Sequence, residues 1–211
     1  MVNLLKKIPT FPHSYISDAD FEVLLGSTPD SRYGKIKRLL AQGKLLHIRR
    51  GLYCLTEELG CLIKPHPFEL AQYIYGPSYI SLESALSFHK LIPETVYTVT
   101  SATAKRSKEF RTPLGVYSYL HLPRENFYVE VERVQEDDRQ FFMAKPWKAI
   151  CDYVYCYRKD WTNLEPLLGS LRMNHDELPS LGVGELQQLQ DYYHHRRLDL
   201  FLKGVHKKLS I

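Results

Sequence analysis

The sequence predicts an α+β fold, in which an N-terminal winged helix-turn-helix precedes a mixed domain with a mainly antiparallel sheet and flanking helices. Two amphipathic helical patterns ahead of residue 43 run into a short hairpin pattern, and this order is typical of a winged helix. Further along, segments that alternate apolar and polar residues predict strands, and helical patterns follow them. With 211 residues, 44% of them hydrophobic, the chain can build one or two domains with a sizeable core.

The first predicted helix begins after Ser17, a suitable N-cap, and ends at Gly26. We expect its buried face to consist of Phe21, Leu24 and Leu25. A turn of about three residues separates it from the next helix, which is the order of a helix-turn-helix motif.

The second helix is predicted at about 29–42, with Thr28 as its N-cap, Pro29 at its first position and Gly43 just past its end. At about 100° per residue, one arc of the helix is apolar and consists of Tyr33, Ile36, Leu39 and Leu40. The opposite arc is polar and consists of Ser31, Lys35, Arg38 and Gln42. Arg32 lies angularly near the apolar arc. The helix should therefore bury one stripe and present a cationic one to solvent.

After this helix, the segments KLLHI and LYCLT predict two strands joined by a tight turn at Arg50 and Gly51. Arg49 and Arg50 would then project from the tip of a wing. From Arg32 to Arg50 the chain carries seven cations and no Asp or Glu. Because a solvated surface normally mixes both signs, this stretch indicates a polyanionic partner.

We therefore predict that the N-terminal module binds double-stranded DNA. The candidate contact residues are Ser31, Arg32, Lys35, Arg38, Arg49 and Arg50. The helix would meet base edges or phosphates in the major groove, and the wing arginines would touch phosphates or a minor groove. The alternatives are a protein-docking module and an ordinary solvated surface, because basic amphipathic helices serve both purposes as well.

Residues 57–67 lose periodicity and contain glycine and two prolines, so they predict a boundary between a DNA-binding domain at 1–57 and a second domain at 66–211. Helices are predicted there within 67–76, 81–91, 145–157, 164–171 and 184–209, the last as one long helix with an irregularity near Gly204. Strands are predicted within 95–102, 115–123, 127–134 and 139–144. Between two of them, the polar loop 101–111 carries three cations that are candidates for a recognition surface, namely Lys105, Arg106 and Lys108.

Several classes of protein are disfavoured by what the sequence lacks. No apolar run is long enough to cross a bilayer, and the first eleven residues contain neither an apolar signal core nor a small-residue cleavage site, so a cytoplasmic protein without membrane contact is expected. The four cysteines form no CxxC pair, and no metal site or cofactor is predicted. No P-loop, GxSxG, HExxH or GxGxxG motif is present, which argues against an enzyme.

Three segments carry a resemblance to a known family. They are RRGLYCL at 49–55, YISLESALSFHKLIPETVYTVTSATAKRSKEFRTPLGVYSYLHL at 79–122, and AKPWKAICDYVY at 144–155. In these segments and in their order, the chain resembles the AbiEi-type antitoxins of type IV (abortive infection) toxin–antitoxin systems. It departs from that pattern at Lys90, where glycine is expected, and at Trp147, where glutamate is expected.

The resemblance implies a non-enzymatic DNA-binding protein that represses its own operon through inverted repeats and counteracts a nucleotidyltransferase-like toxin encoded beside it. The C-terminal domain would then carry the antitoxic function, with Lys105, Arg106 and Lys108 on its surface. Two alternatives stay open. One is a winged-helix regulator whose C-terminal domain senses a small ligand and has no toxin partner, and the other is a hydrolase or nuclease built on that domain.

Overall fold

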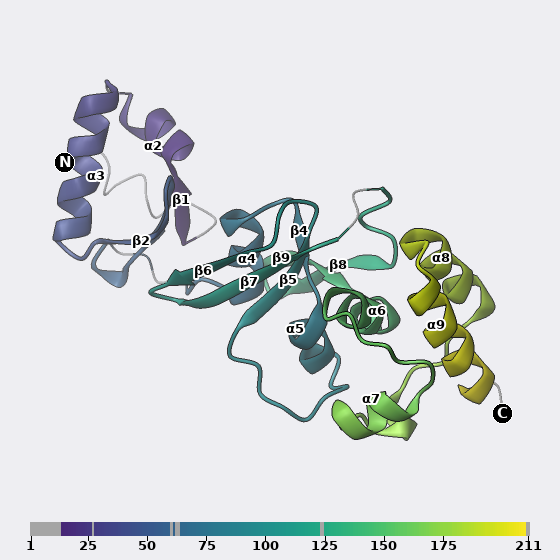
Figure 1. Ribbon diagram of the computed structural model, residues 1–211. Coiled ribbons are helices and arrows are strands. Elements are labelled where there is room, and N and C mark those ends of the chain that lie inside the picture. The colour runs from purple at the N-terminus through teal and green to yellow at the C-terminus, as the bar shows by residue number, and fades with distance from the viewer. Residues whose placement is uncertain (1–13, 27, 60, 62–63, 123–124, 210–211) are drawn as a thin grey trace.

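The computed structural model confirms the α+β class (Figure 1). It describes residues 14–26, 28–59, 61, 64–122 and 125–209. The first eleven residues, from which the absence of a signal core is predicted, lie outside the described residues. Within the described part of the chain, no helix combines the length and apolar character needed to cross a membrane.

The N-terminal module contains a three-stranded antiparallel sheet with the strand order β1-β3-β2. Its elements run in the order β1 (Tyr15–Ser17), α2 (Asp18–Leu25), α3 (Pro29–Ala41), β2 (Leu45–Arg49) and β3 (Leu52–Leu55). The two helices and the hairpin therefore lie where the sequence predicts them. The first strand was not predicted from the sequence.

The predicted ends of both helices are confirmed. The hydroxyl of Ser17 accepts a hydrogen bond from the Asp20 amide, and the Asp20 carboxylate accepts one from the Ser17 amide, which completes a capping box. Gly26 ends α2 in the left-handed conformation. Thr28 is the N-cap of α3, although its side chain makes no capping bond.

The predicted buried stripe of α3 is wrong at its N-terminal end. Ile36 and Leu39 are buried, but Tyr33 is 69% exposed. Arg32 turns inward instead, with its side chain 16% exposed and Nη1 3.8 Å from the Glu22 carboxylate on α2. Tyr33 instead borders the open hollow between α3 and the hairpin, where solvent reaches its ring.

A six-stranded mixed sheet forms the centre of the molecule, with the strand order β6-β7-β5-β4-β9-β8. The strands are β4 (Ser78–Ile80), β5 (Val99–Thr103), β6 (Lys108–Thr112), β7 (Gly115–His121), β8 (Val131–Glu136) and β9 (Arg139–Ala144). Three pairings are antiparallel, whereas β4 with β9 and β5 with β7 are parallel. The prediction of a loop over 101–111 is wrong, because β5 and β6 occupy both its ends and only 104–107 connect them.

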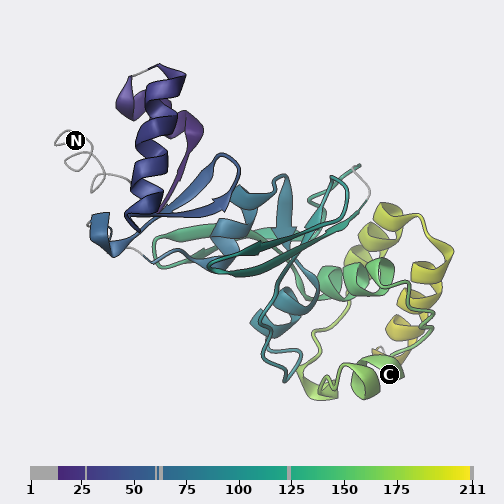
Figure 2. The ribbon, with the colours of Figure 1, turned by 60° about the vertical axis from the view of Figure 1, so that its left-hand side comes forward.

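Helices cover both faces of this sheet (Figure 2). The helix α4 (Pro67–Ile74) lies on one face, and α5 (Leu82–Phe88) and α6 (Pro146–Cys156) lie on the other. Beyond α6, the helices α7 (Glu165–Ser170), α8 (Val183–Tyr193) and α9 (Arg196–Leu209) form the end of the molecule opposite to the N-terminal module.

The single long helix predicted over 184–209 is wrong. His194 adopts a left-handed conformation with φ of 41°, so the chain ends α8 there and begins α9 at Arg196. This break lets α8 and α9 pack against each other and against α6, which buries Leu189, Tyr193 and Phe201. Burying two apolar faces in this way favours a pair of helices over one straight helix.

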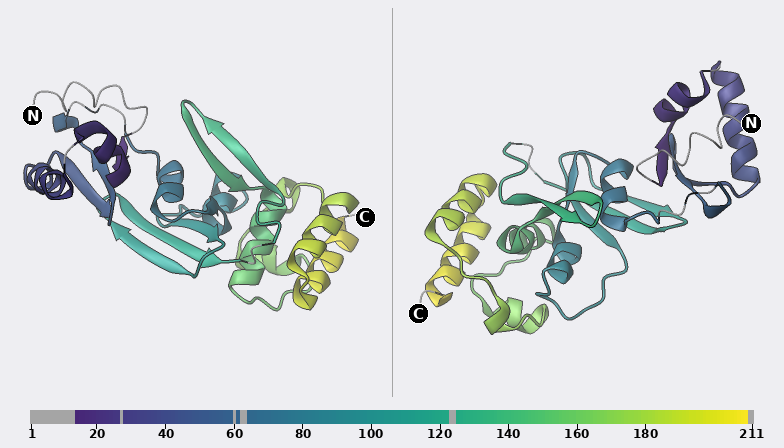
Figure 3. Two further views of the ribbon diagram at one scale, coloured as in Figure 1. Left: turned by 90° about the horizontal axis from the view of Figure 1, so that it is seen from above. Right: turned by 180° about the vertical axis from the view of Figure 1, so that it is seen from behind.

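The hairpin of the N-terminal module belongs to two cores at once. One side of the small sheet packs under α2 and α3, with Ile16, Phe21, Ile36, Leu39 and Tyr53 at its centre. The other side joins the main core of the six-stranded sheet through Tyr15, Ile48, Leu52 and Cys54. Figure 3 shows that the β6–β7 hairpin extends to the small sheet on this second side, where the small sheet joins the main core. The N-terminal module is therefore seated directly on the central sheet.

Gly204 marks a close approach between α9 and the loop that contains Thr162. A Cβ atom at this position would overlap the carbonyl oxygen of Thr162. We expect Gly204→Ala to lower the free energy of unfolding by roughly 1–3 kcal/mol, because the backbone must move apart. The measurement is urea unfolding followed by circular dichroism.

The matched control is Gly34→Ala in the middle of α3, where an added Cβ meets nothing within 4 Å. Alanine is the better helix former by up to about 1 kcal/mol, so this variant should be slightly more stable than the wild type. Equal effects of the two substitutions would contradict the close approach at Gly204.

Candidate nucleic-acid interface

The outward face of α3 is cationic and open to solvent. Lys35, Lys37 and Arg38 are exposed, and so is Ser31 one turn earlier. Among the residues that the structure describes, no carboxylate lies within ion-pair distance of these three cations. The helix thus presents positive charge without internal neutralisation, which is the arrangement that attracts a polyanion.

The two arginines of the hairpin turn point in different directions. The Arg49 guanidinium donates hydrogen bonds to the carbonyl oxygens of Arg50, at 2.7 Å, and Tyr73, at 3.0 Å. It therefore holds the hairpin against the last turn of α4. Arg50 is exposed at the turn. The structure thus keeps Ser31, Lys35, Arg38 and Arg50 on the surface, whereas Arg32 and Arg49 hold neighbouring elements together.

Arg50 also lies beside cations from the second half of the chain. A cleft of about 410 Å³ opens between the hairpin turn, the end of α4 and β6. Its lining consists of Arg49, Arg50, Ile74, Tyr75, Gly76, Lys105, Lys108 and Phe110. We call it the basic cleft. It brings together two groups of residues that the sequence places in separate predicted surfaces, although Arg106 is not among them.

Aromatic rings form the floor of the basic cleft. The Lys105 Nζ atom lies 5.2 Å from the centre of the Tyr75 ring, and the Lys108 Nζ atom lies 4.6 Å from that of Phe110. Neither ring is among the residues predicted from the sequence. The alternation of Lys108 and Phe110 along β6 could have indicated that they share a face, but nothing in the sequence brings Tyr75 to them.

A second hollow separates α3 from the hairpin and has a volume of about 500 Å³. Tyr33 and Lys37 line it from the helix, and His47, Arg50 and Tyr53 line it from the strands and their turn. Arg50 therefore borders both hollows. Of the exposed cations of α3, Lys37 shares this hollow with Arg50, and Asp18 also lines it.

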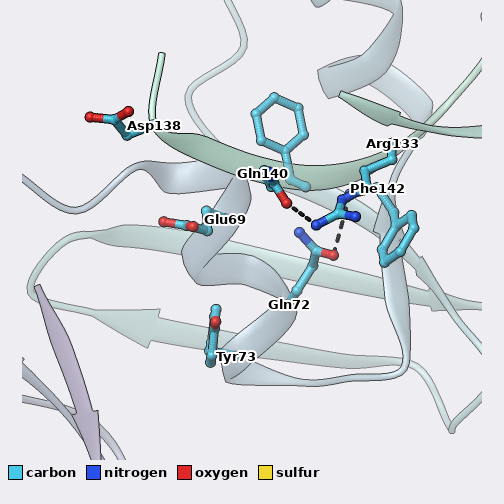
Figure 4. Close-up of a pocket in the computed structure, with 8 residues that line it drawn as sticks. Glu69, Gln72, Tyr73, Arg133, Asp138, Gln140 and Phe142 are labelled. Atoms are coloured by element: carbon cyan, nitrogen blue, oxygen red, sulfur yellow. Dashed lines mark hydrogen bonds between the residues drawn. The ribbon is translucent and has the colours of Figure 1, made fainter. Parts of the chain in front are cut away.

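A third and larger hollow, of about 700 Å³, lies between α4 and the β8–β9 hairpin (Figure 4). Its lining carries both charge signs and consists of Glu69, Gln72, Tyr73, Arg133, Asp138, Gln140, Phe141 and Phe142. The Arg133 guanidinium donates to the Gln140 side chain, and the Phe142 amide donates to Gln72 Oε1 at 3.3 Å. Because these polar groups already bind one another, we assign no ligand to this hollow.

One buried polar cluster lies on the inner side of α6. Lys148 and Asp152, both fully buried, form an ion pair with 2.8 Å between Nζ and Oδ1. The Asp152 carboxylate also accepts hydrogen bonds from the hydroxyls of Ser81, at 2.6 Å, and Tyr79, at 3.0 Å, and from Tyr193. The cluster joins α6 to the chain around β4 and to the end of α8.

Burial lowers the pKa of Lys148, against the opposing effect of the Asp152 carboxylate. A lysine of lowered pKa is a familiar feature of catalytic sites, but this one is enclosed by rings, with Nζ 3.6 Å from the centre of Tyr192 and 4.5 Å from that of Tyr193. No hollow described above reaches it. We read the cluster as structural. The sequence signal for it, a lysine and an aspartate four residues apart in an apolar helix, was not used.

Metal-ligating side chains, cysteines and similarity to known proteins do not identify a further site. Within the described residues, no group of three or more His, Cys, Asp or Glu side chains gathers as a metal site would require. None of the four cysteines, all of which the structure describes, forms a disulfide bond. No family model matches this sequence, and no curated protein is significantly similar to it.

The buried ion pair yields a stability prediction. Asp152→Ala leaves the Lys148 ammonium buried without a counter-charge, so we expect the free energy of unfolding to fall by about 3–5 kcal/mol. Glu165→Ala is the matched control, because Glu165 pairs with Lys208 at the same 2.8 Å but on the surface. We expect no measurable change there. A similar small effect of both substitutions in urea unfolding would contradict the structural role of the cluster.

Proposed function

We propose that the protein is a non-enzymatic, DNA-binding regulator whose residues up to about 57 act as a winged helix. The observation that carries the proposal is the unneutralised cationic face of α3 beside the exposed Arg50 of the hairpin turn. The element order supports it, because two helices precede a hairpin whose second strand pairs with a strand ahead of them.

In this proposal, α3 enters the major groove of double-stranded DNA. Lys35 and Arg38 lie on the same side of the helix as Ser31 and would contact base edges or phosphates. Arg50 would contact the backbone from the hairpin turn. Arg32 and Arg49 have a supporting role, since their guanidinium groups bind the protein itself. Lys37, which was not among the predicted contacts, is exposed on the same helix and joins the set.

A single module of this size covers too little DNA for tight specificity, since one module buries roughly 600–1,000 Å² of protein surface. Two copies on inverted repeats would provide a larger interface, in keeping with the autorepression implied by the AbiEi resemblance. The same resemblance supports a cytoplasmic antitoxin that counteracts a nucleotidyltransferase-like toxin. Lys105, Arg106 and Lys108 remain candidates for that antitoxic surface.

The DNA-binding half can be tested by fluorescence anisotropy with the DNA immediately upstream of the gene and a shuffled duplex. We expect Lys35→Ala and Arg38→Ala each to weaken binding to the upstream DNA by roughly 1–3 kcal/mol if the side chain contacts a base. For a side chain that contacts a phosphate, the slope of the logarithm of affinity against the logarithm of salt concentration should fall by about one.

The matched control is Lys203→Ala, which removes an exposed lysine from α9 at the far end of the molecule. It should leave both affinity and salt slope unchanged. Unchanged affinity of the Lys35→Ala and Arg38→Ala proteins would refute the assignment of α3 as the recognition helix.

The antitoxin half needs a separate experiment. Co-expression of the protein with the nucleotidyltransferase-like protein encoded beside it should restore growth that the latter inhibits. We expect the Lys35→Ala/Arg38→Ala variant to restore growth as well, because antitoxicity is proposed to lie in the C-terminal domain. Failure of the wild type to restore growth, at confirmed expression of both proteins, would count against an antitoxin.

A further inference from the structure

The cations of the basic cleft come from two parts of the chain that are distant in sequence. Arg49 and Arg50 come from the hairpin turn of the N-terminal sheet, whereas Lys105 and Lys108 come from the β5–β6 turn and the start of β6. An anion placed between them would be held from both sides. The lining of the basic cleft contains four cations and no carboxylate.

The strand geometry of β6 places its acidic residue, Glu109, on the face away from the cleft. Successive side chains of a strand point to opposite faces, so Lys108 and Phe110 share one face and Glu109 and Arg111 the other. The Arg111 Nε atom donates to the Glu109 carboxylate at 3.0 Å, which neutralises this acid on the face away from the cleft. The acidic residue nearest in sequence therefore does not cancel the positive charge of the cleft.

The cations of the cleft differ in how they are held. Two hydrogen bonds to backbone carbonyls fix the Arg49 guanidinium. Within the part of the chain that the structure describes, no carboxylate lies within ion-pair distance of Arg50, Lys105 or Lys108. Three exposed head groups are thus available to a ligand, beside the half-buried rings of Tyr75 and Phe110.

We propose that the basic cleft binds a nucleoside polyphosphate. The phosphate groups would lie between Arg50 on one side and Lys105 and Lys108 on the other, where several ammonium and guanidinium groups provide charge-assisted hydrogen bonds. The base would lie against Tyr75 or Phe110, in place of the lysine head group that lies over that ring and turns to the phosphates, because aromatic side chains accept bases by stacking.

The size and shape of the cleft favour a small ligand over a DNA backbone. Its volume of about 410 Å³ lies within the range of roughly 300–1,000 Å³ that is common for small-molecule sites. A DNA duplex has a convex surface, so its phosphates would reach the exposed cations of the cleft more readily than the half-buried rings. A nucleotide can contact the floor and both walls together.

Isothermal titration of the full-length protein at low salt tests the proposal, with ATP, GTP and inorganic tripolyphosphate as the probes. We expect at least one nucleotide to bind to the wild type and to bind at least about tenfold more weakly to Lys105→Ala/Lys108→Ala. Both replaced side chains are exposed, and circular dichroism will verify that the variant is folded. The control is Lys203→Ala/Lys207→Ala, which removes two exposed lysines from α9 and should bind as the wild type does.

Four results would overturn the proposal. Absence of nucleotide binding to the wild type, or equal binding to all three proteins, would mean that the cleft has no such ligand. Equal affinity for tripolyphosphate and for both nucleotides would refute the contact between base and ring. Loss of affinity for the upstream DNA in Lys105→Ala/Lys108→Ala, without nucleotide binding by the wild type, would assign the cleft to the DNA backbone instead. None of these results bears on the test of Lys35 and Arg38, so the two proposals can fail independently.

Discussion

The seating of the hairpin on the central sheet is the constraint on which the surface of this protein depends. Ile48, Leu52 and Cys54 point into the main core, while the opposite side of the same strands packs under α2 and α3. The Arg49 guanidinium adds two hydrogen bonds at the turn, one of them to the Tyr73 carbonyl of α4. Because the same two strands are shared, the direction of α3 and the position of Arg50 are both set relative to the central sheet.

The regular periodicity of α3 and β6 decides which of their cationic side chains are exposed. In α3 the helical repeat sends Lys35 and Arg38 outward while Ile36 and Leu39 turn in. In β6 the two-residue repeat sends Lys108 to the cleft and Glu109 to the other face. Arg50 borders both the hollow beside α3 and the basic cleft.

Local features of the fold could be predicted from the sequence because local interactions decide them. The capping box at Ser17 and the left-handed Gly26 each depend on a few neighbouring residues. The exposure of Tyr33 could not be predicted, because helical periodicity groups it with Ile36 and Leu39 but does not show which positions of that arc are covered in the folded module. The break at His194 was missed for a similar reason, since only packing of α8 and α9 on α6 makes it favourable. The proximity of Arg50 to Lys105 and Lys108 could not be predicted from the sequence. It depends on the tertiary structure, because no short-range pattern links residues so far apart in the chain.

The double role of the hairpin limits how freely the N-terminal module can be exchanged. In many regulators a DNA-binding module is joined by a flexible linker, so that recombination can attach it to a new sensor without repacking either part. Here a transplanted module would carry Tyr15, Ile48 and Leu52 as an uncovered apolar surface, and its arginine at position 49 would lack the carbonyl that it binds. Under the proposed DNA-binding role, changes in specificity should therefore arise by substitution along the outer face of α3, with the hairpin and its seat inherited as one unit.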